Sequence, residues 1–160
     1  MRFTRALVFT ALFCAGGATS AFADLTGFIG ANTTPANRPV VGGAFGMGLL
    51  MLGFEFEFAS TPDDPAASAP SLKTGMGNVL LQTPVEFAGL QPYVTAGGGI
   101  YNESLGDHSD TNFGTNAGAG VKITLIGPLR LRVDYRVFKL GSGALNTPAH
   151  RIYAGLNLKF

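Results

Sequence analysis

The chain has 160 residues, the size of one compact domain, and 46% of them are hydrophobic while only 13% are charged. Glycine, with 23 residues, and phenylalanine, with 13, are abundant, and tryptophan is absent. The formal net charge is +1 at pH 7, so no basic field favours nucleic acid as a partner.

The N-terminal segment has the three parts of a secretory signal peptide. Arg2 and Arg5 make a basic start, and residues 6–15 form an apolar stretch. The Ala-Phe-Ala sequence at 21–23 supplies the small residues that a signal peptidase requires. We therefore predict export through the secretory pathway and cleavage before Asp24.

Cleavage there divides the chain into a removed signal peptide, residues 1–23, and a mature domain, residues 24–160. Cys14 lies in the removed part, so the mature domain has no thiol for a disulfide, a metal site or a nucleophile. A lipoprotein signal ending at Cys14 is the alternative, and the bulky Phe13 argues against it because lipid-anchored precursors carry a small residue there. Loss of the two signal-peptide arginines lowers the formal charge from +1 to about −1 by subtraction.

The most hydrophobic stretch of the mature domain, residues 40–54, does not predict a membrane-spanning helix. It is interrupted by glycines and is shorter than the ~20 apolar residues that such a helix needs. It continues into residues 55–58, Glu-Phe-Glu-Phe, which alternate at period two. We predict a strand, a turn and a strand, with one apolar face formed by Val41, Phe45, Met47, Leu49, Phe54, Phe56 and Phe58.

The same alternation continues along the chain and predicts about eight strands of roughly ten residues, the length at which a tilted strand crosses a bilayer. They are expected near residues 24–33, 40–49, 52–60, 72–83, 92–103, 112–126, 129–140 and 149–160. In lipid every backbone donor and acceptor must pair, so such a sheet is expected to close on itself.

The connections between these strands alternate in kind. Polar segments rich in Pro, Gly, Ser, Asp and Asn are expected as exposed loops at 35–39, 61–71, 104–111 and 141–148. The links near 49–52 and 126–128 are tight, whereas the link at 84–91 is longer than this scheme requires. Short turns at one end and longer loops at the other are typical of a barrel with both termini in the periplasm.

Charged residues alternate on the faces opposite the apolar ones. An eight-stranded barrel is just wide enough for side chains to fill its interior, where charges must be paired. The third and seventh strands lie across such a barrel, so Glu55 and Glu57 are expected to meet Arg132 and Arg136, with Asp134 bridging neighbours. The predicted lumen charge network consists of Glu55, Glu57, Lys122, Arg130, Arg132, Asp134 and Arg136.

The last ten residues alternate without a break and end on Phe160. Such a pattern fits a strand between two different solvents. One face carries Ile152, Ala154, Leu156, Leu158 and Phe160, and the other carries Arg151, Tyr153, Asn157 and Lys159.

Three segments of the second half carry family motifs. Residues 91–101 read QPYVTAGGGIY, residues 131–138 read LRVDYRVF, and residues 150–160 read HRIYAGLNLKF. They resemble the "PYVGAGVG" strand, the penultimate strand and the "HRVSAGLSYRF" closure of the opacity-protein and porin-like family of small outer-membrane β-barrels. The resemblance implies an all-β fold, an eight-stranded antiparallel up-and-down transmembrane β-barrel.

The resemblance also implies a route of assembly. The closing strands of outer-membrane barrels are recognised by the barrel-assembly machinery, so that machinery and periplasmic chaperones are expected partners. The expected assembly signal consists of Ile152, Tyr153, Leu156, Leu158 and Phe160. Outer-membrane lipids and lipopolysaccharide are expected around a monomer.

No enzymatic activity, cofactor or metal is expected, and the loops are expected to contribute to envelope structure or surface interaction. One alternative is a narrow porin or a conduit for hydrophobic molecules, which a filled lumen argues against. Another is an enzyme that modifies lipid A or phospholipid, which would need a His and a Ser two residues apart on a strand. His150 is followed by Arg151 and Ile152. Residues 107–110, Asp-His-Ser-Asp, are a candidate cation site, with a solvated loop tip as the simpler interpretation.

Overall fold

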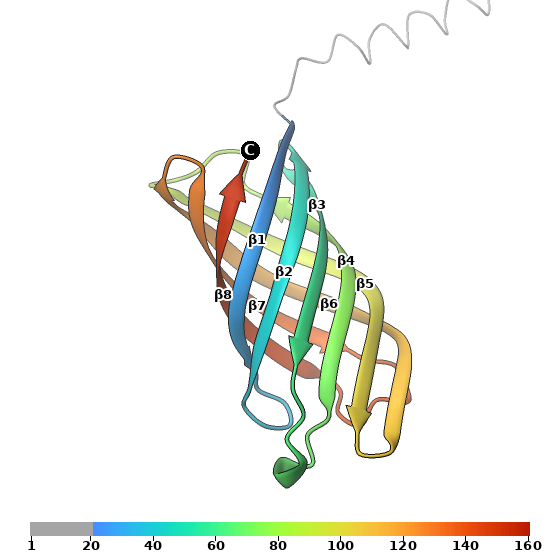
Figure 1. The fold of residues 1–160 in the computed structure, drawn as a ribbon. Helices are drawn as coiled ribbons and strands as arrows, with labels where there is room; N and C mark the ends of the chain where they lie inside the picture. Colours follow the sequence, from blue (N-terminus) through green and yellow to red (C-terminus); the bar gives the residue numbers. More distant parts are fainter. Residues whose placement is uncertain (1–20) are drawn as a thin grey trace, which may run out of the picture.

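The structure, a computed structural model, describes residues 21–160. These residues form one closed antiparallel barrel in which each strand pairs with its sequence neighbours and β8 pairs with β1 (Figure 1). The strands are β1 (Ala21–Asn32), β2 (Arg38–Leu49), β3 (Leu52–Thr61), β4 (Ser71–Gln82), β5 (Leu90–Leu105), β6 (His108–Ile126), β7 (Leu129–Lys139) and β8 (Ala149–Lys159). The predicted eight-stranded up-and-down barrel is confirmed.

One end of the barrel, called the turn end here, carries short connections. Leu50 and Met51 join β2 to β3, and Gly127 and Pro128 join β6 to β7. The C-terminus lies beside the start of β1 at the same end (Figure 1). Gly127 has φ +54°, a left-handed conformation in which a glycine is not strained.

The longer link between β4 and β5 also lies at the turn end and contains a small hairpin. Phe87 and Leu90 exchange backbone hydrogen bonds of 2.9 and 3.0 Å. Ala88 and Gly89 between them have φ values of 51° and 76°, as in the tight turns that suit twisted strands. The additional residues of this link therefore form a separate tight turn.

The opposite end, called the loop end, carries the connections 33–37, 62–70 and 140–148. The second of these contains a short 3₁₀ helix, η1 (Pro65–Ala67), capped by the side chain of Asp64.

The prediction of a loop over residues 104–111 is wrong. β5 and β6 continue through it and turn only at Gly106 and Asp107, with Ser104 paired to Ser109. Polar composition suggested a loop, but strand pairing satisfies the backbone whatever the side chains are, and here the Asn102 side chain also donates to the Thr111 hydroxyl at 2.8 Å.

The outer wall is apolar and the inner face is buried, as the alternation predicted. Phe56 and Phe58 are 56% and 67% exposed, while Glu55 and Glu57 between them are buried. Val41, Phe45, Met47, Leu49 and Phe54 are exposed on the same wall. Among residues 21–160, no helix is long and apolar enough to cross a membrane.

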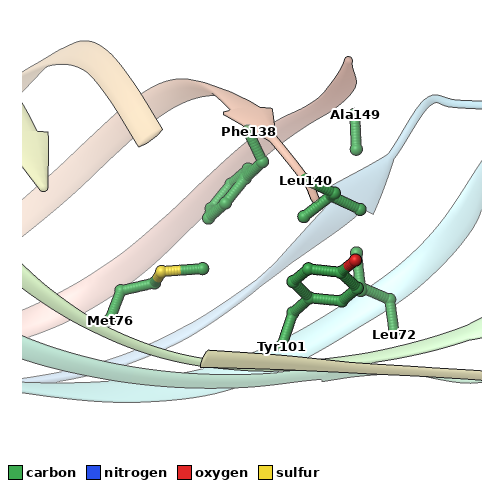
Figure 2. Packing of buried hydrophobic residues seen from close by; sticks show 6 residues of the cluster. All are labelled: Leu72, Met76, Tyr101, Phe138, Leu140 and Ala149. Carbon is green, nitrogen blue, oxygen red and sulfur yellow. The ribbon is translucent and has the colours of Figure 1, made fainter. Parts of the chain in front are cut away.

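The lumen is filled by an apolar layer and a charged layer, together with a second apolar cluster around Phe28 and Tyr153 and the buried Arg38 and Glu103 near the loop end. Figure 2 shows the layer near the loop end, a cluster of buried apolar side chains: Leu72, Met76, Tyr101, Phe138, Leu140 and Ala149. Closer to the turn end lies the charged layer, which consists of Asp24, Glu55, Glu57, Lys122, Arg130, Arg132, Asp134, Arg136 and Arg151. Arg151 joins the two, because its guanidinium carbon lies 4.4 Å from the centre of the Phe138 ring.

Candidate functional site

The charged layer of the lumen is the part of the molecule in which chemically active side chains meet. Period-two alternation directs every second residue of a strand inward, and neighbouring strands are in register, so acids on β3 and bases on β7 reach the same space. Four of the five charged residues of β7 occupy alternate positions from Arg130 to Arg136, and these four are buried.

Glu55 lies at the centre of this layer. Both of its carboxylate oxygens are used, because Oε2 accepts from Arg132 and Oε1 accepts from Nη2 of Arg136 at 2.8 Å. The Asn78 side chain from β4 is a further donor, at 3.4 Å. The structure thus brings the predicted cross-lumen partners into contact.

Glu57 lies one step closer to the loop end. Its Oε2 is 3.1 Å from Nη1 of Arg136 and accepts a 3.0 Å hydrogen bond from the Tyr153 hydroxyl. Its Oε1 is 3.2 Å from Nη1 of Arg151 on β8. Glu57 therefore pairs with Arg136 and Arg151. It makes no ion pair or hydrogen bond with the side chain of Arg132.

Asp134 lies between the two arginines of its own strand. Its oxygens are 2.8 Å from Nη2 of Arg132 and 3.0 Å from Nε of Arg136. The Tyr93 hydroxyl on β5 donates to Asp134 and accepts from Nε of Arg132 at 2.7 Å. Asp134 thus occupies the bridging position that was expected for it.

Lys122 and Arg130 form a separate group at the turn end. Both contact Asp24 of β1, with Nζ of Lys122 at 2.7 Å and Nη2 of Arg130 at 3.4 Å. Arg130 also donates to Asn157 at 2.9 Å and to Gln91 at 3.0 Å. These two bases lie in the lumen, as alternation predicted, and the acid that they share is Asp24.

Sequence reasoning missed several members of the network, namely Asp24, Tyr93, Arg151 and Tyr153. Alternation had assigned Arg151 and Tyr153 to the polar face of the last strand, which was a sufficient signal for a place in the lumen. Asp24 was treated as the first residue after a cleavage site. Gly46 of β2 is the residue paired with Asp24, and a Cβ added at Gly46 would lie 2.5 Å from Oδ1 of Asp24.

Little free space remains in the charged layer. A cavity of about 10 Å³, roughly the space of one water molecule, is lined by residues that include Phe22, Asp24, Glu55 and Lys122. The larger hollows that we find lie on the outer wall, for example one of about 540 Å³ lined by Gly27, Ile29 and Leu156.

The candidate cation site at 107–110 includes His108, whose side chain lies outside the described part of the structure. Among the side chains that are described, no group of three or more His, Cys, Asp or Glu residues is arranged to hold a metal. Asp110 instead accepts a hydrogen bond from Tyr101 at 2.9 Å. His150 Nδ1 lies 2.7 Å from the Tyr135 hydroxyl on the outer surface.

The predicted assembly signal lies on β8 and divides between the two faces. Ile152, Leu156, Leu158 and Phe160 are exposed on the outer wall. Tyr153 instead points into the lumen and stacks on Phe28 with ring centres 4.0 Å apart. The role of all five residues in assembly stays a prediction.

The comparisons with known proteins concern the fold. No protein-family model matches the chain, and no curated protein matches it. The N-terminal β-barrel domain of Pseudomonas aeruginosa OprF has a TM-score of 0.65 at 16% identity, over 87% of this chain and 97% of that domain. Neisserial surface protein A has a TM-score of 0.63 at 18% identity, over 88% and 96%. Ail of Yersinia pestis has a TM-score of 0.53 at 13% identity, over 88% and 100%.

These likenesses define a class of fold. The chain is a small eight-stranded antiparallel barrel of the kind found in outer-membrane proteins, as the sequence resemblance implied. At such identities the comparison carries the fold and no activity.

Proposed function

We propose that this chain is a monomeric, non-enzymatic outer-membrane protein whose filled lumen is closed and whose loops contribute to envelope structure or surface interaction. The apolar outer wall supports the location. Side chains such as Ile29, Phe58 and Ile100 are 71%, 67% and 64% exposed, which would be unfavourable in water and is favourable in lipid.

Two lysines support the orientation and the lipid partners. Lys73 on β4 and Lys139 on β7 are exposed on the outer face near the loop end. Lysines at this height suit a rim beside phosphate groups, and lipopolysaccharide carries phosphates in the outer leaflet. The loop end is therefore proposed to face outward and the turn end to face the periplasm, with lipopolysaccharide and outer-membrane lipids around the wall.

The single observation that carries the closed lumen is that its buried charges are paired, in one group around Asp24 at the turn end and in a second group around Glu55, Asp134 and Glu57. Such pairs are stable in a poorly solvated interior only when each charge has partners. The apolar cluster around Phe138 closes the lumen above them. A porin or conduit would require a path through both layers.

Two observations, one on the outer surface and one in the lumen, support the proposal that the protein has no enzymatic activity. His150 contacts a tyrosine, and the buried carboxylates Glu55 and Glu57 are occupied by arginines and tyrosine, without room for a substrate. Purified protein in lipid A and phospholipid vesicles should release no fatty acid or headgroup. Release above that of a heat-denatured sample would contradict this proposal.

Biogenesis would use the secretory translocon, periplasmic chaperones and the barrel-assembly machinery. A closed barrel has no free strand edge, so it needs no second copy to complete its sheet, which supports a monomer. The location is tested by separating inner and outer membranes on a density gradient. The folded protein should fractionate with the outer membrane and migrate differently on gels before and after heating, and recovery in the soluble fraction would contradict the proposal.

A further inference from the structure

The first strand begins before the predicted cleavage position. Ala21, Phe22 and Ala23 pair in register with residues 47–49 of β2. The backbones of Ala23 and Phe160 exchange two hydrogen bonds of 2.8 Å each, which complete the β1–β8 closure at the turn end. Cleavage before Asp24 would remove this last pairing of the barrel.

The Phe22 side chain fills the turn end of the lumen. The Phe22 ring occupies the space that a side chain at position 48 would need, so glycine fits there. Phe22 also lines the small cavity beside Asp24. The ammonium groups of Lys159 and Lys122 lie 4.8 and 5.9 Å from its ring centre, within the range of cation–π contacts. Phe22 thus separates the Asp24–Lys122 ion pair from the solvent at this end.

A new N-terminus at Asp24 would also place a positive charge close to the Asp24–Lys122 ion pair. Asp24 is 2% exposed and already contacts two cations, Lys122 and Arg130. An α-amino group is largely protonated at neutral pH, so it would add a third cation near this one carboxylate, which would also lose its cover by Phe22. Ala21 is exposed, and an amino group there would be solvated.

The sequence offers a cleavage motif that avoids these costs. Ala18-Thr19-Ser20 has small residues at the first and third positions before Ala21, which meets the requirement of a signal peptidase. We propose that the peptidase hydrolyses the Ser20–Ala21 peptide bond. Water supplies a hydroxyl to the Ser20 carbonyl carbon and a proton to the Ala21 nitrogen, so the mature chain begins at Ala21 and keeps Phe22 as a cap on the lumen.

This inference rests on the proposed export, and one measurement separates the two. Protein purified from outer membranes is analysed by N-terminal sequencing and intact mass. A start at Ala21, read as Ala-Phe-Ala-Asp, is the expected result. A start at Asp24, or at any other processed position, overturns the inference and leaves export standing, whereas only uncleaved chains starting at Met1 would overturn both.

A substitution gives an independent readout. Phe22→Ala should lower the mass of the mature protein by the difference between the two side chains and shift its urea unfolding midpoint downward, because the lumen loses its cap. Phe13→Ala is the matched control, since position 13 is removed under either cleavage and the mature mass and midpoint should equal those of the parent. An unchanged mature mass for Phe22→Ala would overturn the inference.

Discussion

Glu55 is a buried carboxylate, 2% exposed, whose oxygens are used by Arg132 and Arg136. A charge in such a place is stabilised only by its partners, because water is largely excluded from them. Removing one member leaves the others without full compensation. Removing an acid and a base together leaves the lumen closer to neutral.

The first prediction tests this compensation. Glu55→Gln should lower the free energy of unfolding by about 3 to 5 kcal/mol, since it removes an acid that Arg132 and Arg136 share and leaves the lumen with an excess of buried positive charge. The double variant Glu55→Gln with Arg132→Gln should cost clearly less than the sum of the two single variants. The measurement is urea unfolding in lipid vesicles, analysed as a double-mutant cycle.

The control for this cycle is Glu86→Gln. Glu86 is exposed at the turn end and lies 3.8 Å from Arg130, so its loss should change stability by no more than about 0.5 kcal/mol. Strict additivity of Glu55→Gln and Arg132→Gln would remove the cross-lumen pairing from the account.

The sequence alone predicts part of this charged layer. Alternation identifies which residues face the lumen, so Glu55, Asp134 and Arg136 could be grouped in advance. The strand count placed the third strand across from the seventh, so the contacts of Glu55 with Arg132 and Arg136 could be expected. Other partners depend on strand tilt and stagger, which set the height of each side chain. Asp24 and Lys122, 98 residues apart in the chain, could therefore not be paired from the pattern alone.

At the scale of elements, the closure between β1 and β8 is the pairing that completes the sheet. It joins the two ends of the described chain from Asp24–Lys159 to Asn32–Arg151 and is extended to Phe160 by the bonds with Ala23. Until it forms, two strand edges remain unpaired, which is unfavourable in lipid.

The second prediction concerns this closing strand. Deleting Phe160, or replacing it with Asp, should sharply reduce the folded, membrane-inserted fraction while synthesis and export continue. Heat-modifiable gel mobility of membrane fractions gives the measurement. Phe87→Asp is the control, because Phe87 is 84% exposed in a turn-end link and should assemble as the parent does. Normal assembly without Phe160 would rule out the C-terminal signal.

The strands themselves were largely predictable, since alternation is a local property. Their ends were less so. The polar composition of residues 104–111 suggested a loop, whereas backbone pairing extends the β5–β6 hairpin to Gly106. The link before Leu90 could not be assigned because its turn uses Ala88 at a positive φ, where glycine or asparagine is the usual indicator.

At the scale of the whole molecule, the two ends of the barrel differ in their connections, and this difference predicts orientation. Single cysteines at Ser68 and Ser109, both at the loop end, should react with an impermeant maleimide on intact cells, whereas one at Gly127 at the turn end should not. The background is low because Cys14 is the single cysteine of the chain and lies in the predicted signal peptide. Labelling at Gly127 with protection at both loop-end sites would reverse the proposed topology.

The filled lumen is also a property of the whole barrel, since seven of its strands contribute side chains to the charged layer and an apolar layer lies above it. Single-channel recording in planar bilayers tests it most directly. The purified parent protein, inserted and verified as folded, should carry no steady ionic current, with at most brief openings in Glu55→Gln. A steady current through the unmodified protein, proportional to voltage, would contradict the closed lumen and favour a pore.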